Sequence, residues 1–327
     1  MTQESETRTT PVMDQLRQKL GEVPWVWSFL GAAVMWVIAV YVADGKGAGD
    51  MLSAAMSFSV YFVIVGIGQM FVITLGPGNI DLSIPANMAL SGALAMKVMG
   101  GSDAMILVGL LAALGSGVAV GTFNYGLIRI LRIPPIIATL SASFLIQSVA
   151  ISYGRGLRIK PPEGLGEFMS VQLGGVPAIA VLTVGLAAIM AVVLGRTPYG
   201  RGLIAIGQNT RAAWLAGINV EVTRYLAYTL CAVFAGLTGA LLAAFSGGAS
   251  LNMGEEYLLS SIAVVVIGGT SIAGGRSNVP GIVGAALFLY LMVTMLNAMG
   301  AGPGMRSLMT GLIIVGVITL AGGETDT

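Results

Sequence analysis

Long apolar runs separated by short polar stretches make up most of this 327-residue chain. A helix needs about 20 mostly apolar residues to cross the hydrocarbon core of a bilayer, and most of the runs approach that length. The pattern therefore predicts an all-α, polytopic membrane protein with about ten transmembrane helices. The predicted spans are residues 25–42, 51–75, 84–99, 104–131, 134–153, 178–195, 225–245, 257–273, 279–299 and 305–321.

Residues 74–85 break the apolar pattern between the second and third predicted spans. The stretch reads Thr-Leu-Gly-Pro-Gly-Asn-Ile-Asp-Leu-Ser-Ile-Pro, so it combines helix-breaking Gly and Pro with one carboxylate, Asp81. Non-helical backbone at membrane depth is tolerated only where protein or a water-filled cavity satisfies its N–H and C=O groups. We therefore expect this first break to lie against protein or line a path through it.

A second Gly-rich interruption covers residues 268–281. It also follows an apolar run, reaches a proline at Pro280, and opens another apolar run. Interrupted segments in the two halves of a transporter are the sequence trace of an internal structural repeat. The two breaks therefore predict such a repeat.

The distribution of Lys and Arg predicts the orientation, because cytoplasmic connections carry an excess of these residues. With the N-terminus in the cytoplasm, ten basic residues fall on the inner side and six on the outer side. Residues 1–24 and 322–327 are then cytoplasmic, and residues 25–321 form a single transmembrane domain. Its two long connections are an outer, periplasmic loop at 155–177 and an inner, cytoplasmic loop at 196–224.

The amino-acid composition excludes several classes of function. Charged residues make up 9% of the chain, against about 25% in an ordinary soluble domain. The absence of histidine removes histidine acid/base catalysis and imidazole metal ligands, and the single cysteine, Cys231, allows neither an internal disulfide nor a cysteine metal cluster. We therefore expect no metal site and no enzyme activity in this chain. The chain has no catalytic pair of side chains that an intramembrane enzyme would need. An ion-coupled secondary transporter would need more buried acids than this chain offers.

Asp81 is the one acid expected near the membrane interior, where an ionised side chain costs about 2.5–3.5 kcal/mol. One interpretation is that Asp81 or Ser83 caps the helix that starts near residue 84, with Pro85 in its first turn. The other is direct contact of Asp81 with a polar solute, and both stay open. Together with polar residues inside nearby spans, the candidate solute-path residues are Asn79, Asp81, Ser83, Gln69 and Asn124.

The inner loop is too long for a turn and holds four arginines against one acid, Glu221. Asn209 can cap a short helix through Leu215 that Gly217 ends. Such a helix either lies on the membrane surface or docks on a cytoplasmic partner. No Walker A pattern is present, since none of the lysines is followed by Ser or Thr, so any ATP that drives this protein must bind another chain.

Residues 78–83, Gly-Asn-Ile-Asp-Leu-Ser, resemble the G-G-I-D-L-S motif of ribose-type ABC importer permeases, the membrane subunits of monosaccharide uptake systems. The likeness returns in order at residues 199–218 and 268–275, and it extends over most of residues 51–321. Asn79 and Pro85 stand where the family usually has Gly, so ribose itself is not carried over as the solute. Permeases for branched-chain amino acids share the architecture and are the alternative.

The resemblance implies a permease subunit that imports a monosaccharide or similar polyol across the bacterial inner membrane. Such subunits pair in the membrane with a second copy or a related chain, bind two cytoplasmic ATPase domains that hold ATP and Mg, and receive sugar from a periplasmic binding protein. This chain would then hold no cofactor itself. We expect docking of the binding protein at Arg155, Arg158 and Lys160, and coupling to the ATPase through Arg201, Asn209, Arg211, Trp214, Leu215 and Gly217.

Overall fold

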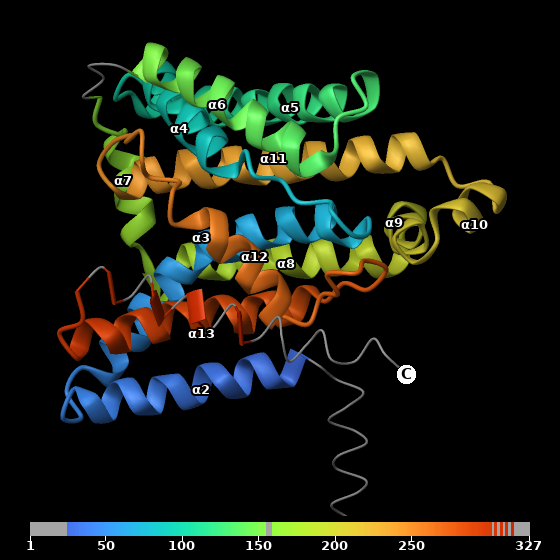
Figure 1. The fold of residues 1–327 in the computed structure, drawn as a ribbon. Coiled ribbons are helices and arrows are strands. Elements are labelled where there is room, and N and C mark those ends of the chain that lie inside the picture. The colour runs from blue at the N-terminus through green and yellow to red at the C-terminus, as the bar shows by residue number, and fades with distance from the viewer. Residues whose placement is uncertain are drawn as a thin grey trace, which may run out of the picture.

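The fold is a bundle of long helices, seen in a computed structural model that describes residues 25–154, 159–302, 304–305, 308–309, 311–312 and 315–316 (Figure 1). Apart from one two-stranded ribbon, the regular elements of this part are helices, which confirms the all-α class. The tenth predicted span, 305–321, falls largely outside the described residues. The total of ten spans therefore stays a prediction.

The elements follow the predicted spans closely. Their bounds are α2 (Trp25–Val42), α3 (Ala48–Thr74), α4 (Ile84–Met99), the 3-10 turn η1 (Asp103–Met105), α5 (Ile106–Ile130), α6 (Pro135–Gly154), α7 (Glu163–Ser170), β1 (Gln172–Leu173), β2 (Val176–Pro177), α8 (Ala178–Arg196), α9 (Pro198–Gln208), α10 (Thr210–Leu215), α11 (Val220–Phe245), α12 (Tyr257–Ile267) and α13 (Val279–Ala298).

Seven helices of the described part are long and apolar enough to cross a membrane: α2, α3, α5 with its preceding turn, α6, α8, α11 and α13. Helix α4 has the 16 residues of its predicted span, 84–99. Helix α12 is shorter than expected, because it has 11 residues and ends at Ile267, not at residue 273. The prediction extended this span into the glycines of the second break, where Gly268 and Gly269 end the helix. Helix α11 begins at Val220, five positions before the predicted 225, because Asn219 caps it.

Helices α3 and α11 form the centre of the bundle and run in opposite directions (Figure 1). Their largest buried side chains include Tyr61, Phe71 and Tyr228. Glycine allows the close approach between them, because a side chain at Gly68 would lie 3.1 Å from the α carbon of Cys231. Close backbone contact at small residues is typical of helix packing in membranes. Helices α2, α5, α6 and α8 instead expose many large apolar side chains, as expected of surfaces that face lipid.

A long helix, a non-helical segment and a short helix follow one another twice in the chain, as α3, 75–83 and α4, and again as α11, 246–256 and α12. Segment 246–256 contacts both α6 and α4. The Gln147 amide of α6 donates to the Leu251 carbonyl at 3.1 Å, and Gly254 lies against the backbone of Pro85 in the first turn of α4. The short helices α4 and α12 therefore begin close together. The internal repeat predicted from the two Gly-rich breaks is not tested by this arrangement and stays a prediction.

Basic residues of the described part separate between the two ends of the bundle. Helices α9 and α10 lie at one end and α7 at the other (Figure 1). The loops and helix ends on the α10 side carry arginines, and those on the α7 side carry lysines. The arginines are Arg129, Arg132, Arg196, Arg201, Arg211, Arg224 and Arg276, and the lysines are Lys46, Lys97 and Lys160.

Candidate functional site

Helix α10 is a short helix with well-formed ends, as the sequence predicted. The Asn209 side chain accepts a hydrogen bond from the Ala212 N–H at 2.9 Å, which caps the first turn. At the other end Gly217 adopts a left-handed conformation with φ +84°. The N–H groups of Gly217 and Ile218 then donate to the carbonyls of Trp214 and Ala213 at 3.0 and 3.1 Å. This is the Schellman pattern, which favours glycine at that position.

The outer face of α10 is apolar and basic. Trp214 is 65% exposed and Leu215 is 71% exposed, whereas Ala213 on the opposite face is buried. Arg211 is also exposed, and within the described residues it forms no ion pair. An exposed Trp beside an exposed Leu on a capped helix matches the anchors of a helix that binds in a groove.

Helix α9 connects α8 to α10 and is packed firmly. Thr197 caps it by accepting from the Gly200 N–H at 3.2 Å, and Pro198 stands at its start, where its fixed φ suits the first turn. The ring of Tyr199 packs on Phe71 at 6.0 Å between centroids. Its hydroxyl is buried, which raises the pKa of Tyr199 and keeps the phenol neutral. Arg201, a predicted coupling residue, is exposed.

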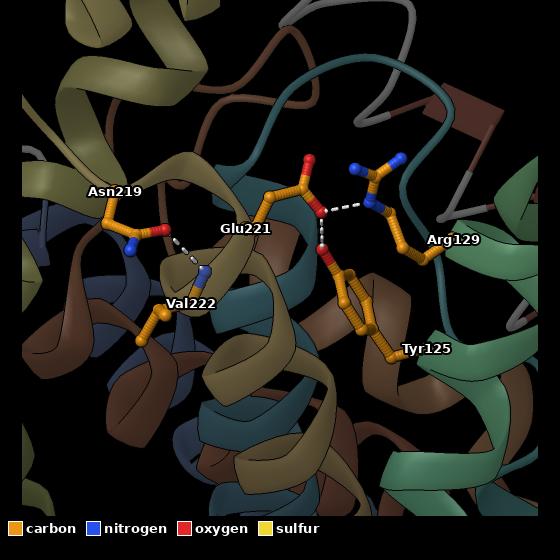
Figure 2. Close-up of polar contacts among 5 residues, drawn as sticks. All are labelled: Tyr125, Arg129, Asn219, Glu221 and Val222. Carbon is orange, nitrogen blue, oxygen red and sulfur yellow. Dashed lines mark hydrogen bonds and ion pairs between the residues drawn. The ribbon is translucent and has the colours of Figure 1, made fainter.

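A polar cluster joins the C-terminal part of α5 to the start of α11 (Figure 2). The Glu221 carboxylate accepts from the Tyr125 hydroxyl at 2.7 Å and pairs with the Arg129 guanidinium at 2.6 Å. Figure 2 also shows Asn219, which accepts from the Val222 N–H at 3.1 Å and caps α11. Because Arg129 and Glu221 are about half exposed, their pairing contributes at most about 1 kcal/mol.

The first break, residues 75–83, contains part of a buried network of polar side chains. One oxygen of Asp81 accepts from the backbone N–H and the hydroxyl of Ser83, at 2.8 and 2.7 Å. The Asn124 amide donates to the Ser83 hydroxyl at 2.8 Å and lies 3.4 Å from both Asp81 oxygens. Gln69 accepts from the Asp81 N–H at 3.3 Å. None of these four side chains has exposed surface.

Thr139 on α6 completes the network. Its hydroxyl accepts from the Leu82 N–H and lies within donating distance of the Ile80 carbonyl, both at 3.1 Å. Helices α3 and α6 thus supply hydrogen-bond partners to the backbone of the break, as irregular backbone inside a membrane requires. Two buried amide atoms of the network, the nitrogen of Gln69 and the oxygen of Asn124, have no partner among the described residues.

The predicted cap of α4 is wrong in its simple form. Ser83 occupies the cap position, but its side chain accepts no hydrogen bond from the first turn. Its backbone is already helical, with φ −86° and ψ −4°, whereas a capping side chain needs an extended backbone. Asp81 instead folds back on the N–H two residues ahead, as Asp often does in turns. Pro85 lies in the first turn of α4, as predicted.

Asn79 stands apart from the other predicted solute-path residues because it is partly exposed. Its side-chain oxygen accepts from the Tyr228 hydroxyl at 3.0 Å, and its amide donates to the Gly76 carbonyl at 3.1 Å. The structure therefore groups Gln69, Asp81, Ser83 and Asn124 in one buried cluster and leaves Asn79 at its edge.

The predicted docking residues of the outer loop are only partly placed. Arg155 and Arg158 lie outside the described residues, and Lys160 is exposed. The rest of the loop contains α7 and a β1–β2 ribbon in which Gln172 pairs with Pro177. The described residues hold no group of three or more acidic, Cys or His side chains that could bind a metal.

Sequence reasoning missed three contacts. It identified Glu221 as the single acid of its loop but not its link to Tyr125 and Arg129 across α5. It treated Cys231 as a packing residue, while its thiol also lies 3.6 Å from the Gln69 oxygen. Hydrogen bonds between residues this far apart in the chain leave no local signal in a single sequence.

The known proteins to which this chain is similar are transport permeases. The family model described as "Branched-chain amino acid transport system / permease component" matches residues 51–318. The ribose import permease protein RbsC of Bacillus subtilis is 33% identical over 264 residues, which cover 79% of this chain and 80% of that protein. No solved structure matches.

Two further relatives carry other solute names. The galactofuranose transporter permease protein YtfT of Escherichia coli is 33% identical over 287 residues, covering 85% of this chain and 81% of the relative. The autoinducer 2 import system permease protein LsrC of Salmonella paratyphi B is 28% identical over 296 residues, covering 89% of this chain and 85% of the relative.

Proposed function

We propose that the solute of this chain is a monosaccharide or a similar polyol. The chain belongs to the permease family whose description names branched-chain amino acid transport systems. It is a membrane-spanning permease subunit of an ATP-driven importer, and its own role is transport. The observation that carries the solute class is the similarity to ribose and galactofuranose permeases over 79% and 85% of the chain. The same relatives favour this solute class over a branched-chain amino acid.

The solute path is proposed to pass Asn79. This side chain is partly exposed, and its amide and carbonyl are suited to sugar hydroxyls. Gln69, Asp81, Ser83 and Asn124 are fully buried, so in this conformation they hold the break in place next to the path and do not reach a solute. An acid inside the membrane is a functional candidate by default. For Asp81, the hydrogen-bond donors of Ser83 and Asn124 are sufficient to stabilise the buried carboxylate.

Helix α10 is proposed to dock in a groove of the partner ATPase, which binds the ATP and Mg. Trp214 and Leu215 supply the apolar anchors, and Asn209 and Gly217 fix the ends of the helix. Arg201 and Arg211 are exposed and unpaired within the described residues. Complementary charge steers association and suppresses wrong partners, so we expect the groove to carry acidic residues. With this docking we propose that α10 and both termini lie in the cytoplasm, as the distribution of Lys and Arg predicts.

The remaining partners are a periplasmic solute-binding protein and a second permease, either another copy or a related chain. The outer loop at 155–177, with Arg155, Arg158 and Lys160, is the proposed docking surface of the binding protein.

The function is tested by reconstituting the permease with its ATPase and binding protein in vesicles. We expect uptake of a labelled monosaccharide that needs ATP and continues after an ionophore removes ion gradients. Uptake of leucine in place of sugar would overturn the solute class, and uptake driven by an ion gradient without ATP would overturn the mechanism.

The docking of α10 is tested by Trp214→Ala. Because the side chain is exposed, we expect the permease to fold normally while its hold on the ATPase weakens by about 2 kcal/mol or more, as for a hot-spot aromatic. Co-purification of the ATPase measures this. The control is Val222→Ala, which removes an exposed apolar side chain from the first turn of α11, outside α10. Equal retention of the ATPase by Trp214→Ala and the control would remove Trp214 from the interface.

A further inference from the structure

Three segments that are far apart in the sequence meet where α9 ends. They are the end of α3 at Thr74, the second break at Gly274 and Gly275, and Gly207 with Gln208 on α9. The Gly275 N–H donates to the Thr74 carbonyl at 3.0 Å, and the Gln208 amide donates to the Gly275 carbonyl at 3.3 Å. Both breaks and the last turn of α9 therefore touch one another through backbone.

The meeting point has no room for side chains. A β carbon added at Gly207 would overlap the Thr74 carbonyl oxygen and the Gly275 nitrogen, and one added at Gly274 would overlap the backbone of Gly76. Gly275 has φ +71° and packs against Gln208, whose backbone nitrogen would lie 2.8 Å from an added β carbon. Each of these glycines is thus required by close approach, by a left-handed conformation, or by both.

Helix α10 is joined to this meeting point without a flexible linker. Gln208 ends α9 and the next residue, Asn209, is the cap of α10. The Thr210 hydroxyl donates back to the Ile206 carbonyl at 3.1 Å, so the two helices are tied across the corner. Helix α9 itself is anchored by Leu203 and Ile206, which have at most 1% exposed surface.

We propose that Gly207 and Gln208 are positioning residues that transmit movement of α10 to both breaks at once. Tightly packed backbones transmit strain with little compression, and packed contacts of this kind switch between discrete arrangements. A displacement of α10 then shifts Thr74 at the start of the first break and Gly275 in the second. The inference rests on the proposed docking of α10 and adds to it the route by which ATPase movement reaches the membrane interior.

The test uses the complete importer in vesicles and measures solute transported per ATP hydrolysed, together with ATPase binding. Gly207→Ala introduces the overlap, and Gly195→Ala is the matched control, since a β carbon there meets nothing within 4 Å. We expect the control to behave like the unmodified importer. Gly207→Ala is expected to keep its ATPase and to hydrolyse ATP, while solute per ATP falls by about fivefold or more, the lower range of a coupling between sites.

A second pair of variants separates coupling from folding. Gln208→Leu removes the donor to the Gly275 carbonyl, and Gln208→Lys keeps a donor on a long side chain. We expect Leu to lower solute per ATP and Lys to restore most of it. If Gly207→Ala fails to assemble, the Gln208 pair decides.

The outcomes are distinct from those of the docking proposal. Solute per ATP equal to that of Gly195→Ala, or equal in both Gln208 variants, would overturn the coupling route. Failure of α10 docking would show separately, as undiminished ATPase binding by Trp214→Ala.

Discussion

The two Gly-rich breaks solve the same physical problem in different ways. In the first break, residues 75–83, side chains from α3 and α6 bond the backbone, and Asn124 on α5 bonds the fully buried Asp81 carboxylate of the break itself. In the second, residues 268–278, several polar groups are satisfied within the break, and Gly275 also bonds Thr74 and Gln208. The Asn278 amide donates to the Gly268 carbonyl at 2.8 Å, its backbone N–H donates to the Thr270 hydroxyl at 3.2 Å, and Ser271 and Arg276 pair through backbone at 3.1 Å.

The first break therefore depends more on tertiary contacts, and the second depends more on contacts within its own segment. Several hydrogen bonds of the second break join residues within its own segment, so local sequence sets part of its shape, while Gly275 also bonds Thr74 and Gln208. The first break has its shape only when three other helices are in place. A substitution in the first break should therefore lower the free energy of unfolding of the whole bundle. A substitution in the second should lower it by about as much as the loss of a single helix cap.

The largest effect is expected for Asp81→Leu. This variant leaves the Ser83 N–H and the Ser83 hydroxyl without their acceptor, while the Asn124 amide keeps its bond to the Ser83 hydroxyl. A buried unsatisfied donor costs about 1–3 kcal/mol, so the loss should be about 3 kcal/mol or more in the free energy of unfolding. Asp81→Asn keeps one acceptor oxygen and should lose clearly less. Thermal unfolding of the detergent-purified permease measures both. If Asn proves as damaging as Leu, the charge itself is required and the geometric account fails.

A smaller effect is expected for Asn278→Ala in the second break. The side chain both accepts from the Gly281 N–H at 3.3 Å and donates to Gly268, and losing a cap of this kind costs about 0.5–2 kcal/mol. Asn278→Asp keeps the acceptor and isolates the value of the donor. The same thermal measurement applies. A loss as large as that of Asp81→Leu would contradict the distinction between the two breaks.

The smallest effect is expected for Thr139→Val, which keeps the shape of the side chain and removes the hydroxyl that bridges Ile80 and Leu82. The expected loss is about 1 kcal/mol, the usual net value of a hydrogen bond. Ser141→Ala on the same helix is the control, because Ser141 is exposed. Equal unfolding midpoints for the two variants would show that α6 does not support the break.

The sequence predicted what depends on local order. The apolar runs predicted α2 to α6, α8, α11 and α13 to within a few residues, and Asn209 and Gly217 predicted both ends of α10. Capping chemistry is local, so one sequence suffices for it.

Predictions failed where a partner lay elsewhere in the chain. One interpretation was that Asp81 or Ser83 caps α4, but Ser83 makes no side-chain cap and the Asp81 oxygens bond Ser83 and Asn124. The predicted span of α12 extends to residue 273 because the apolar pattern continues past Gly268 and the left-handed Gly269, where the helix has ended. The contact of Gly207 with Thr74 and Gly275 joins three segments, and no pattern within any one of them reveals it.

The lengths of α4 and α12 have a consequence for how the chain enters the membrane during synthesis. At 1.5 Å per residue, these helices of 16 and 11 residues measure about 24 and 16 Å, short of the ~30 Å hydrocarbon core. Neither can be released into lipid as an independent span. Helix α4 is held by a hydrogen bond from Asn87 to the Ala232 carbonyl of α11, at 2.7 Å. The final packing of α4 therefore forms only after α11 has been synthesised.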